Sequence, residues 1–241
     1  MTHLRGFNYL LPDMSTDRWW NCPTRGRQPE EFGRSLEAEA LNQQPLNITV
    51  CGHSFIRRLE LYAIENFGHY HNFRLEHNVA HVTCIGISGL TVQKLINSHL
   101  HAIVQSRPDI VYLEIGTNDL ADPNKSAREV GDGIKEVCTM LRNLGVKRVV
   151  VGEVTFRVGR GIPYRTPDFN YKVLTLNRYL QVRLDEYSNV GMAFWRHKYL
   201  WQSALQLYVD GVHYTKDGNK RLFRSIRGAL LKSMWVVRDG N

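Results

Sequence analysis

A serine, a histidine and an aspartate in this chain are spaced like the parts of a nucleophilic site. Ser54 follows Gly52 and His53, and Asp210 precedes His213 by three positions. A serine hydroxyl attacks a carbonyl only when a base accepts its proton, and that base needs a third group to hold its tautomer. The spacing suits a turn in which the Asp210 carboxylate accepts from imidazole Nδ1 while Nε2 faces the serine. Taken singly, Ser54 fits a helix N-cap and His213 an exposed loop histidine.

Attack on an acyl group also requires hydrogen-bond donors aimed at the developing oxyanion. Three candidates are the backbone N–H of Ser54, the backbone N–H of Gly89 and the side-chain amide of Asn118. Gly89 lacks a side chain, so a substrate can approach it closely. Taken singly, Gly89 fits a turn glycine and Asn118 a turn former. Together with Asp210 and His213 they favour a hydrolytic site, because unrelated turns would rarely carry these residues in this order.

The elements that must position these residues follow from the hydrophobic pattern. Short β-branched runs alternate with amphipathic stretches, which is typical of a parallel α/β fold with helices on both faces of the sheet. The predicted strands are 47–51, 79–85, 109–115, 148–154 and 190–195, and the predicted helices are 55–66, 91–106, 126–144, 170–187 and 217–237. Ligands of such sheets bind outside the carboxyl ends of the strands. The candidate residues fall directly after predicted strands or before the last helix, so we expect them to meet in a three-layer α/β/α sandwich.

The first 46 residues have a different character. Four of the eight prolines lie there, and no periodicity is sustained. Residues 1–46 are therefore predicted to be an N-terminal arm or linker, and residues 47–241 the folded domain. Trp19 and Trp20 favour docking of this arm, on the domain rather than on a partner, because paired tryptophans are costly to leave in water.

Composition limits the function classes. The chain has 31 basic and 23 acidic residues, a net charge of +8, which favours anionic partners without naming one. No apolar run approaches the roughly 20 residues of a membrane span, and the first residues lack the apolar stretch of a signal peptide. The expectation is a soluble, intracellular, cytoplasmic protein. The four cysteines show no paired spacing, which argues against a zinc ribbon or a disulfide framework.

Four sequence blocks resemble those of the SGNH (GDSL-type) hydrolases. They are Cys51–Phe55 (CGHSF), Gly86–Thr91 (GISGLT), Ile115–Asp119 (IGTND) and Asp210–His213 (DGVH). The resemblance extends from about Asn47 to Val236 and implies a flavodoxin-like domain that hydrolyses an ester or related acyl bond without a metal or organic cofactor. It also implies a role for each matching residue: Ser54 as nucleophile, His213 as base, Asp210 as the group that orients it, and Ser54, Gly89 and Asn118 as the oxyanion hole.

The first block departs from the family pattern at His53, where the family has aspartate. That aspartate is not the acid of the triad, so the change does not remove catalysis. It does put a neutral or cationic group beside the nucleophile, which could weaken activity. Domains with a Gly-His-Ser first block are also similar to ones found in proteins of mobile genetic elements. The α/β-hydrolase elbow, Gly-x-Ser-x-Gly, is excluded because Ile56 stands where its second glycine is required.

The substrate is encoded less clearly. The candidate substrate-binding residues are His53, Arg157, Arg160, Arg165 and Tyr208. Guanidinium groups pair with phosphate or carboxylate and aromatic rings stack on sugars, so an anionic, carbohydrate or lipid acyl ester fits these residues. Solvated basic loops with ordinary core aromatics account for them equally well. Two further hypotheses are a nucleic-acid-associated accessory domain whose hydrolase site is weak or vestigial, and a carbohydrate or lipid binder without turnover. The intact set of candidate catalytic residues favours the enzyme.

Overall fold

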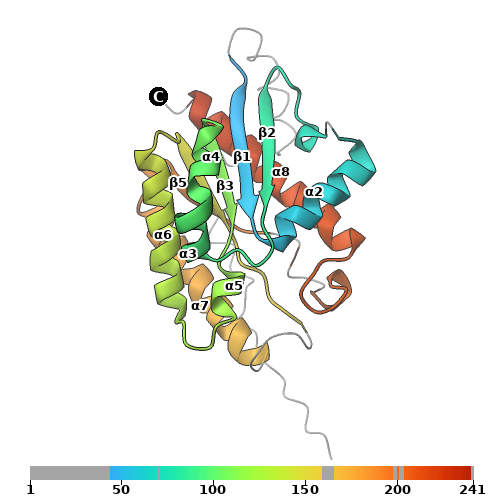
Figure 1. Ribbon diagram of the computed structural model, residues 1–241, viewed down its shortest axis with the longest axis vertical. Helices are drawn as coiled ribbons and strands as arrows, with labels where there is room; N and C mark the ends of the chain where they lie inside the picture. Colours follow the sequence, from blue (N-terminus) through green and yellow to red (C-terminus); the bar gives the residue numbers. More distant parts are fainter. Residues whose placement is uncertain (1–43, 70, 159–165, 198–199, 201–203, 240–241) are drawn as a thin grey trace, which may run out of the picture.

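A parallel sheet of five strands forms the centre of the molecule (Figure 1). The computed structural model describes residues 44–69, 71–158, 166–197, 200 and 204–239, so nearly all of the predicted arm lies outside the described residues. The strands are β1 (Leu46–Gly52), β2 (Ala80–Gly86), β3 (Ile110–Glu114), β4 (Arg148–Gly152) and β5 (Met192–Trp195). Their order is β2-β1-β3-β4-β5 and all neighbours are parallel. This is the flavodoxin-like order, and the predicted fold class is confirmed.

Both faces of the sheet are buried. Successive side chains of a strand point to opposite faces, and side chains of both orientations belong to buried apolar clusters. In β1, Ile48 and Val50 belong to one buried apolar cluster, whereas Cys51 belongs to the other. In β3, Tyr112 and Leu113 divide in the same way. Continuous apolar strands of this kind require a layer of helices on each side.

The helices supply those two layers. They are α2 (Ser54–Phe67), α3 (Val92–Lys94), α4 (Leu100–Gln105), α5 (Thr117–Leu120), α6 (Ala127–Asn143), α7 (Thr166–Asp185) and α8 (Lys216–Asp239). A π-helical segment, Leu95–His99, joins α3 to α4, and short 3-10 turns cover Asn72–Arg74, Ser188–Val190 and Ala204–Leu207. Helices α2 and α8 cover one face, while α3, α4, α6 and α7 cover the other (Figure 1). Within the described ranges, no helix combines the length and the apolar character needed to cross a bilayer.

The structure differs from the sequence-based elements at three places that matter for the site. The predicted strand 148–154 ends at Gly152, because the side chain of Asn177 takes over the peptide groups of Val154. Helix α7 begins at Thr166, four residues before the predicted start. The short helix α5 was not expected, since its four residues are too few for a periodic pattern.

Candidate active site

The first turn of α2 and the turn after β3 meet at the topological switch point of the sheet. β1 lies between β2 and β3, so the chain leaves β1 toward one side of the sheet and returns to the other. Ligands of open α/β sheets bind in the crevice at this point. Ser54 is the first residue of α2, and Asn118 lies in α5, which follows β3. In Figure 1, α5 and the start of α2 lie at the same end of the sheet.

The structure brings Ser54, His213 and Asp210 into one hydrogen-bonded chain, although Ser54 and His213 are 159 positions apart. Ser54 Oγ lies 3.4 Å from Nε2 of His213, and Nδ1 of the same ring lies 2.7 Å from Oδ2 of Asp210. The other carboxylate oxygen, Oδ1, accepts the backbone N–H of Val212 at 3.0 Å and of His213 at 2.7 Å. The backbone of the loop that carries His213 thus orients the Asp210 carboxylate, and this carboxylate in turn holds the His213 imidazole.

The same hydrogen bonds determine the charge of the Asp210 carboxyl and the position of the proton on the His213 ring. The hydrogen bond from His213, together with the two backbone N–H donors, holds the pKa of the Asp210 carboxyl well below its usual range. An ionised carboxylate only accepts hydrogen bonds, so Nδ1 of His213 carries the proton. In the neutral ring, Nε2 is then free to accept the hydroxyl proton of Ser54. A separation of 3.4 Å is long, as is common for such pairs before substrate binds.

His53 caps the helix that begins with the serine. Its Nδ1 accepts the backbone N–H of Phe55 at 3.4 Å, so His53 and not Ser54 is the N-cap residue of α2. Ser54 is the first helical residue, and its N–H is one of the donors that a helix leaves without an intrahelical acceptor. Burial lowers the pKa of the His53 imidazole to about 4, and nearby Glu114 opposes this only partly. The group beside Ser54 is therefore neutral at pH 7.

Hydrogen bonds tie together the three segments that carry the candidate oxyanion donors. The N–H of Ile87, after β2, donates to the carbonyl of Gly52 at 2.9 Å and joins the Gly89 loop to the end of β1. The side-chain amide of Asn118 donates to the carbonyl of Leu90 at 2.9 Å and joins α5 to the same loop. Gly89 itself has φ +68°, a left-handed conformation that favours glycine, and it is exposed.

Asp119, the last residue of the third block, has a different task from its neighbour Asn118. Its buried carboxylate accepts the backbone N–H of Val92 at 3.1 Å and the ammonium of Lys125 at 3.2 Å. Val92 is the first residue of α3, so Asp119 fixes the start of that helix beside the Gly89 loop. Burial raises the pKa of this carboxyl, although the hydrogen bonds from Val92 and Lys125 oppose the shift.

Of the five candidate substrate-binding residues, three lie in the described part of the structure and are buried. Arg160 and Arg165 lie outside the described residues. His53, Arg157 and Tyr208 are 2%, 6% and 8% exposed. The hydroxyl of Tyr208 donates to the carbonyl of Phe156 at 2.6 Å, and the Arg157 guanidinium contacts the turn that carries Asn118. A direct contact between these three side chains and a substrate stays a prediction.

Sequence reasoning missed a buried polar cluster behind the site. Glu114 Oε2 accepts the hydroxyl of Tyr112 at 2.8 Å and lies 3.3 Å from Nε2 of His197. The backbone N–H of His197 donates to the carboxylate of Glu153 at 3.0 Å. Burial raises the pKa of the Tyr112 hydroxyl, so this group stays protonated and donates. Acidic residues at the ends of buried strands, at positions 114 and 153, were the available signal.

Three cysteines of the described part are free thiols and are not candidates for the nucleophile. Burial raises the pKa of Cys51, Cys84 and Cys138 to about 12 in each case. The reactive form of cysteine is the thiolate, which these groups do not reach near neutral pH. Within the described ranges, no group of three or more His, Cys, Asp or Glu side chains is arranged to hold a metal ion.

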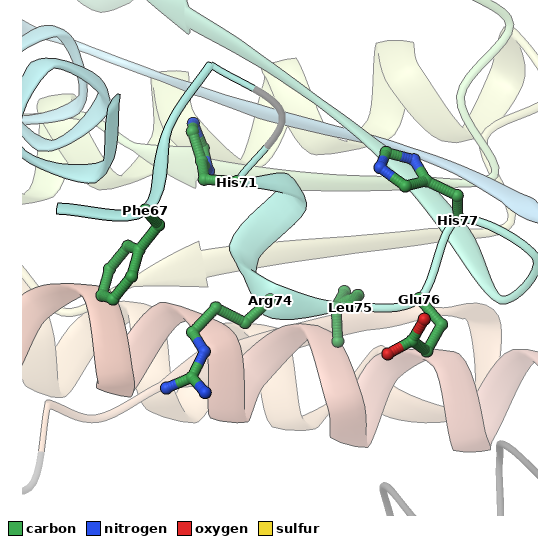
Figure 2. A pocket seen from close by; sticks show the side chains of 6 residues that line it. All are labelled: Phe67, His71, Arg74, Leu75, Glu76 and His77. Carbon is green, nitrogen blue, oxygen red and sulfur yellow. The ribbon is translucent and has the colours of Figure 1, made fainter. Parts of the chain in front are cut away.

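A separate pocket of about 550 Å³ opens at the far end of α2 (Figure 2). Its lining residues are Phe67, His71, Arg74, Leu75, Glu76 and His77. Ser54 begins α2 and Phe67 ends it, so a helix length of roughly 20 Å separates the two places. The pocket holds none of the candidate catalytic residues.

Several solved structures share the fold of this chain. Among solved structures, a Bacteroides fragilis protein proposed to be an acylhydrolase aligns with a TM-score of 0.62 at 16% identity, over 87% of this chain and 100% of that one. A GDSL-like lipase of Bacteroides thetaiotaomicron gives 0.61 at 18% identity, over 86% and 100%. A catalytic mutant of an acetylxylan esterase from Geobacillus stearothermophilus gives 0.56 at 15% identity, over 79% and 94%. At these identities the likeness establishes the fold alone.

The family follows from the sequence match. No functionally curated protein matches the chain. The model of the GDSL-like lipase/acylhydrolase family, by contrast, matches residues 56–221. This stretch begins two residues after Ser54 and includes Gly89, Asn118, Asp210 and His213. The chain therefore belongs to the GDSL-like lipase/acylhydrolase family of SGNH hydrolases.

Proposed function

We propose that this protein is a serine esterase or acylhydrolase that uses Ser54, His213 and Asp210 as its catalytic triad. The observation that supports this most directly is the chain of contacts from Ser54 Oγ to His213 Nε2 at 3.4 Å and from His213 Nδ1 to Asp210 at 2.7 Å. It lies at the carboxyl edge of the sheet, where ligands of this fold bind. The likeness to an acetylxylan esterase, whose catalytic mutant replaces a serine with alanine, agrees with serine chemistry.

The reaction begins when His213 Nε2 accepts the Ser54 hydroxyl proton as Oγ attacks the acyl carbon. The carbonyl oxygen becomes an oxyanion, which the N–H groups of Ser54 and Gly89 and the Asn118 amide stabilise. The imidazolium returns its proton to the departing alcohol, which leaves an acyl group on Ser54. Water then attacks this ester with His213 again as base, and the acid is released.

The test is labelling with a fluorophosphonate probe together with hydrolysis of p-nitrophenyl acetate. We expect the wild type to be labelled and to turn over, and Ser54→Ala and His213→Ala to lose both. The matched controls are Ser98→Ala and His81→Ala, which remove an exposed serine and an exposed histidine elsewhere. A folded wild type that is neither labelled nor active contradicts the proposal and favours a binder of carbohydrate or lipid without turnover.

A second candidate function is association with nucleic acid, which the basic surface of α8 supports. Lys220 and Arg224 are exposed on this helix, and Arg58 is exposed on the neighbouring α2. Phosphate contacts release counterions, so binding would weaken steeply with salt. We expect that neutralising Lys220, Arg221 and Arg224 together abolishes binding to DNA or RNA at low salt. Binding that ignores salt, or no binding at low salt, contradicts this second function.

A further inference from the structure

Two asparagines of α7 extend β4 toward the site. Asn177 accepts the N–H of Val154 at 2.9 Å and donates to its carbonyl at 2.7 Å, as a neighbouring strand would. Asn170 does the same for Arg157, accepting its N–H at 3.0 Å and donating to its carbonyl at 2.9 Å. Seven positions apart, the two asparagines lie on one face of α7. They hold the segment from Val154 to Arg157 after the strand pairing of β4 has ended.

This clamp directs the side chain of Arg157 behind the turn that carries Asn118. The guanidinium is buried and lies over the ring of Phe169, with 4.8 Å between Cζ and the ring centroid. Its Nη2 donates to the carbonyl of Thr117 at 3.3 Å and to Oδ1 of Asn118 at 3.5 Å. Arg157 thus contacts the amide from the side opposite to Leu90.

These two neighbours decide which way the Asn118 amide points. A guanidinium only donates hydrogen bonds, so the Asn118 atom that faces Arg157 must be the oxygen. The carbonyl of Leu90 only accepts, so the atom that faces it must be Nδ2. One hydrogen of Nδ2 is used by Leu90, and the second remains for another acceptor. The orientation is therefore the one in which Asn118 can donate to an oxyanion.

We propose that Arg157 is a positioning residue for the oxyanion hole. This inference rests on the proposed hydrolase function and deepens it. In this role Arg157 acts through Asn118: it fixes the amide in the donating orientation and places a positive charge behind it. The charge polarises the amide, so the Nδ2 hydrogen is a better donor when negative charge develops on the substrate oxygen.

The first test compares Arg157→Met with Arg148→Met. Arg148 is also buried but lies at the opposite end of β4, so it controls for the loss of a buried arginine. We expect Arg157→Met to lower kcat for p-nitrophenyl acetate by about tenfold to a hundredfold with little change in KM, the pattern of a lost transition-state interaction. Arg148→Met should keep the wild-type kcat. Arg157→Lys, which retains the charge, should be intermediate.

A double-mutant cycle separates positioning from a merely structural role. If Arg157 acts through Asn118, Arg157→Met costs less than about twofold further in kcat once Asn118 is already alanine. A full additive loss in the Asn118→Ala background, or a wild-type kcat in Arg157→Met, overturns the inference. The proposed hydrolase function is tested separately, by the loss of turnover in Ser54→Ala.

A third measurement does not depend on turnover. In a ¹⁵N-labelled protein, the side-chain amide signals of Asn118 are identified by their loss in Asn118→Ala. We expect them to be sharp in the wild type and shifted or exchange-broadened in Arg157→Met, with the backbone spectrum otherwise preserved. Unchanged Asn118 signals in a folded Arg157→Met variant contradict the positioning role. If that variant does not fold, Arg157→Lys is measured instead: it should shift the Asn118 signals by a smaller amount, and signals and kcat that both equal those of the wild type contradict the positioning role.

Discussion

The backbone carbonyl of Glu114, the last residue of β3, accepts the N–H of His53 at 3.2 Å. This bond joins the turn that carries Ser54 to the strand that leads into Asn118. Gly52 makes it possible, because a Cβ at this position would lie 2.6 Å from the same carbonyl oxygen. The distance between the proposed nucleophile, Ser54, and the proposed oxyanion donor, Asn118, is thus set by the close approach of two backbone segments.

Gly52→Ala should therefore damage both stability and activity. The added methyl group meets backbone as well as the side chains of Glu114 and Ile56, so the end of β1 must move away from β3. We expect destabilisation of about 1–3 kcal/mol, as for an overpacked core, and a strong loss of kcat. Chemical denaturation and p-nitrophenyl acetate kinetics measure the two effects. Gly145→Ala is the control: its φ of +95° makes an added methyl group strained, but no atom lies within 4 Å, so it should lower stability and keep kcat.

His53 should make the protein less stable in mild acid. Burial lowers the pKa of its imidazole to about 4 in the folded state, whereas the ordinary value in an unfolded chain is about 6.5. Between these pH values the unfolded state binds a proton that the folded state does not, so stability falls as the pH falls. The contribution amounts to on the order of 3 kcal/mol between pH 7 and pH 4.

Replacement of His53 by asparagine tests this dependence. Asparagine can still cap α2 but does not titrate. The difference in unfolding free energy between His53→Asn and the wild type should therefore shift in favour of the variant by about 3 kcal/mol from pH 7 to pH 4. Urea denaturation at several pH values gives both curves. His81→Asn, which changes an exposed histidine, serves as the comparison. A difference between His53→Asn and wild type that stays constant with pH is incompatible with a neutral, buried imidazole.

The main features of the fold could be predicted from the sequence because the buried sheet leaves a strong pattern. All five strands and the five long helical segments lie where the apolar periodicity places them, with ends that shift by up to four residues. The end of β4 could not be predicted, since Val154 continues the apolar run and only the tertiary contact with Asn177 ends the pairing. Pattern alone does not reveal that a helix side chain substitutes for a strand.

The contact among the three candidate triad residues was predictable from the sequence. Ser54, Asp210 and His213 follow from residue type and position, and the structure places them in contact. The supporting residues were not predictable: Asn170 and Asn177 are ordinary polar positions in a helical sequence. The placement of Arg157 was not predictable either, because nothing in the pattern says that its guanidinium turns inward, onto Phe169.

Asp210→Asn should retain the fold and lose most of the turnover. The side chain is half exposed, so the replacement costs little stability. An asparagine can present an N–H to Nδ1 of His213, which puts the imidazole proton on Nε2 and removes the acceptor for the Ser54 hydroxyl. We expect kcat to fall by about a hundredfold to ten-thousandfold. Asp217→Asn, at an exposed acid on α8, is the control, and a kcat equal to wild type in Asp210→Asn would exclude its role in the triad.

Asn177→Ala should be among the more destabilising replacements in α7. The side chain is buried and satisfies both peptide groups of Val154, so alanine leaves a buried N–H and a buried carbonyl without their partner. Each unsatisfied group costs about 1–3 kcal/mol, which predicts a total loss of about 2–6 kcal/mol in urea denaturation. Arg178→Ala, at the exposed neighbouring position, should change stability by less than about 0.5 kcal/mol. Because the released segment leads to Arg157, kcat should fall along with stability. A stable Asn177→Ala variant with full activity would mean that the strand pairing of β4, not the asparagine clamp, holds this segment in place.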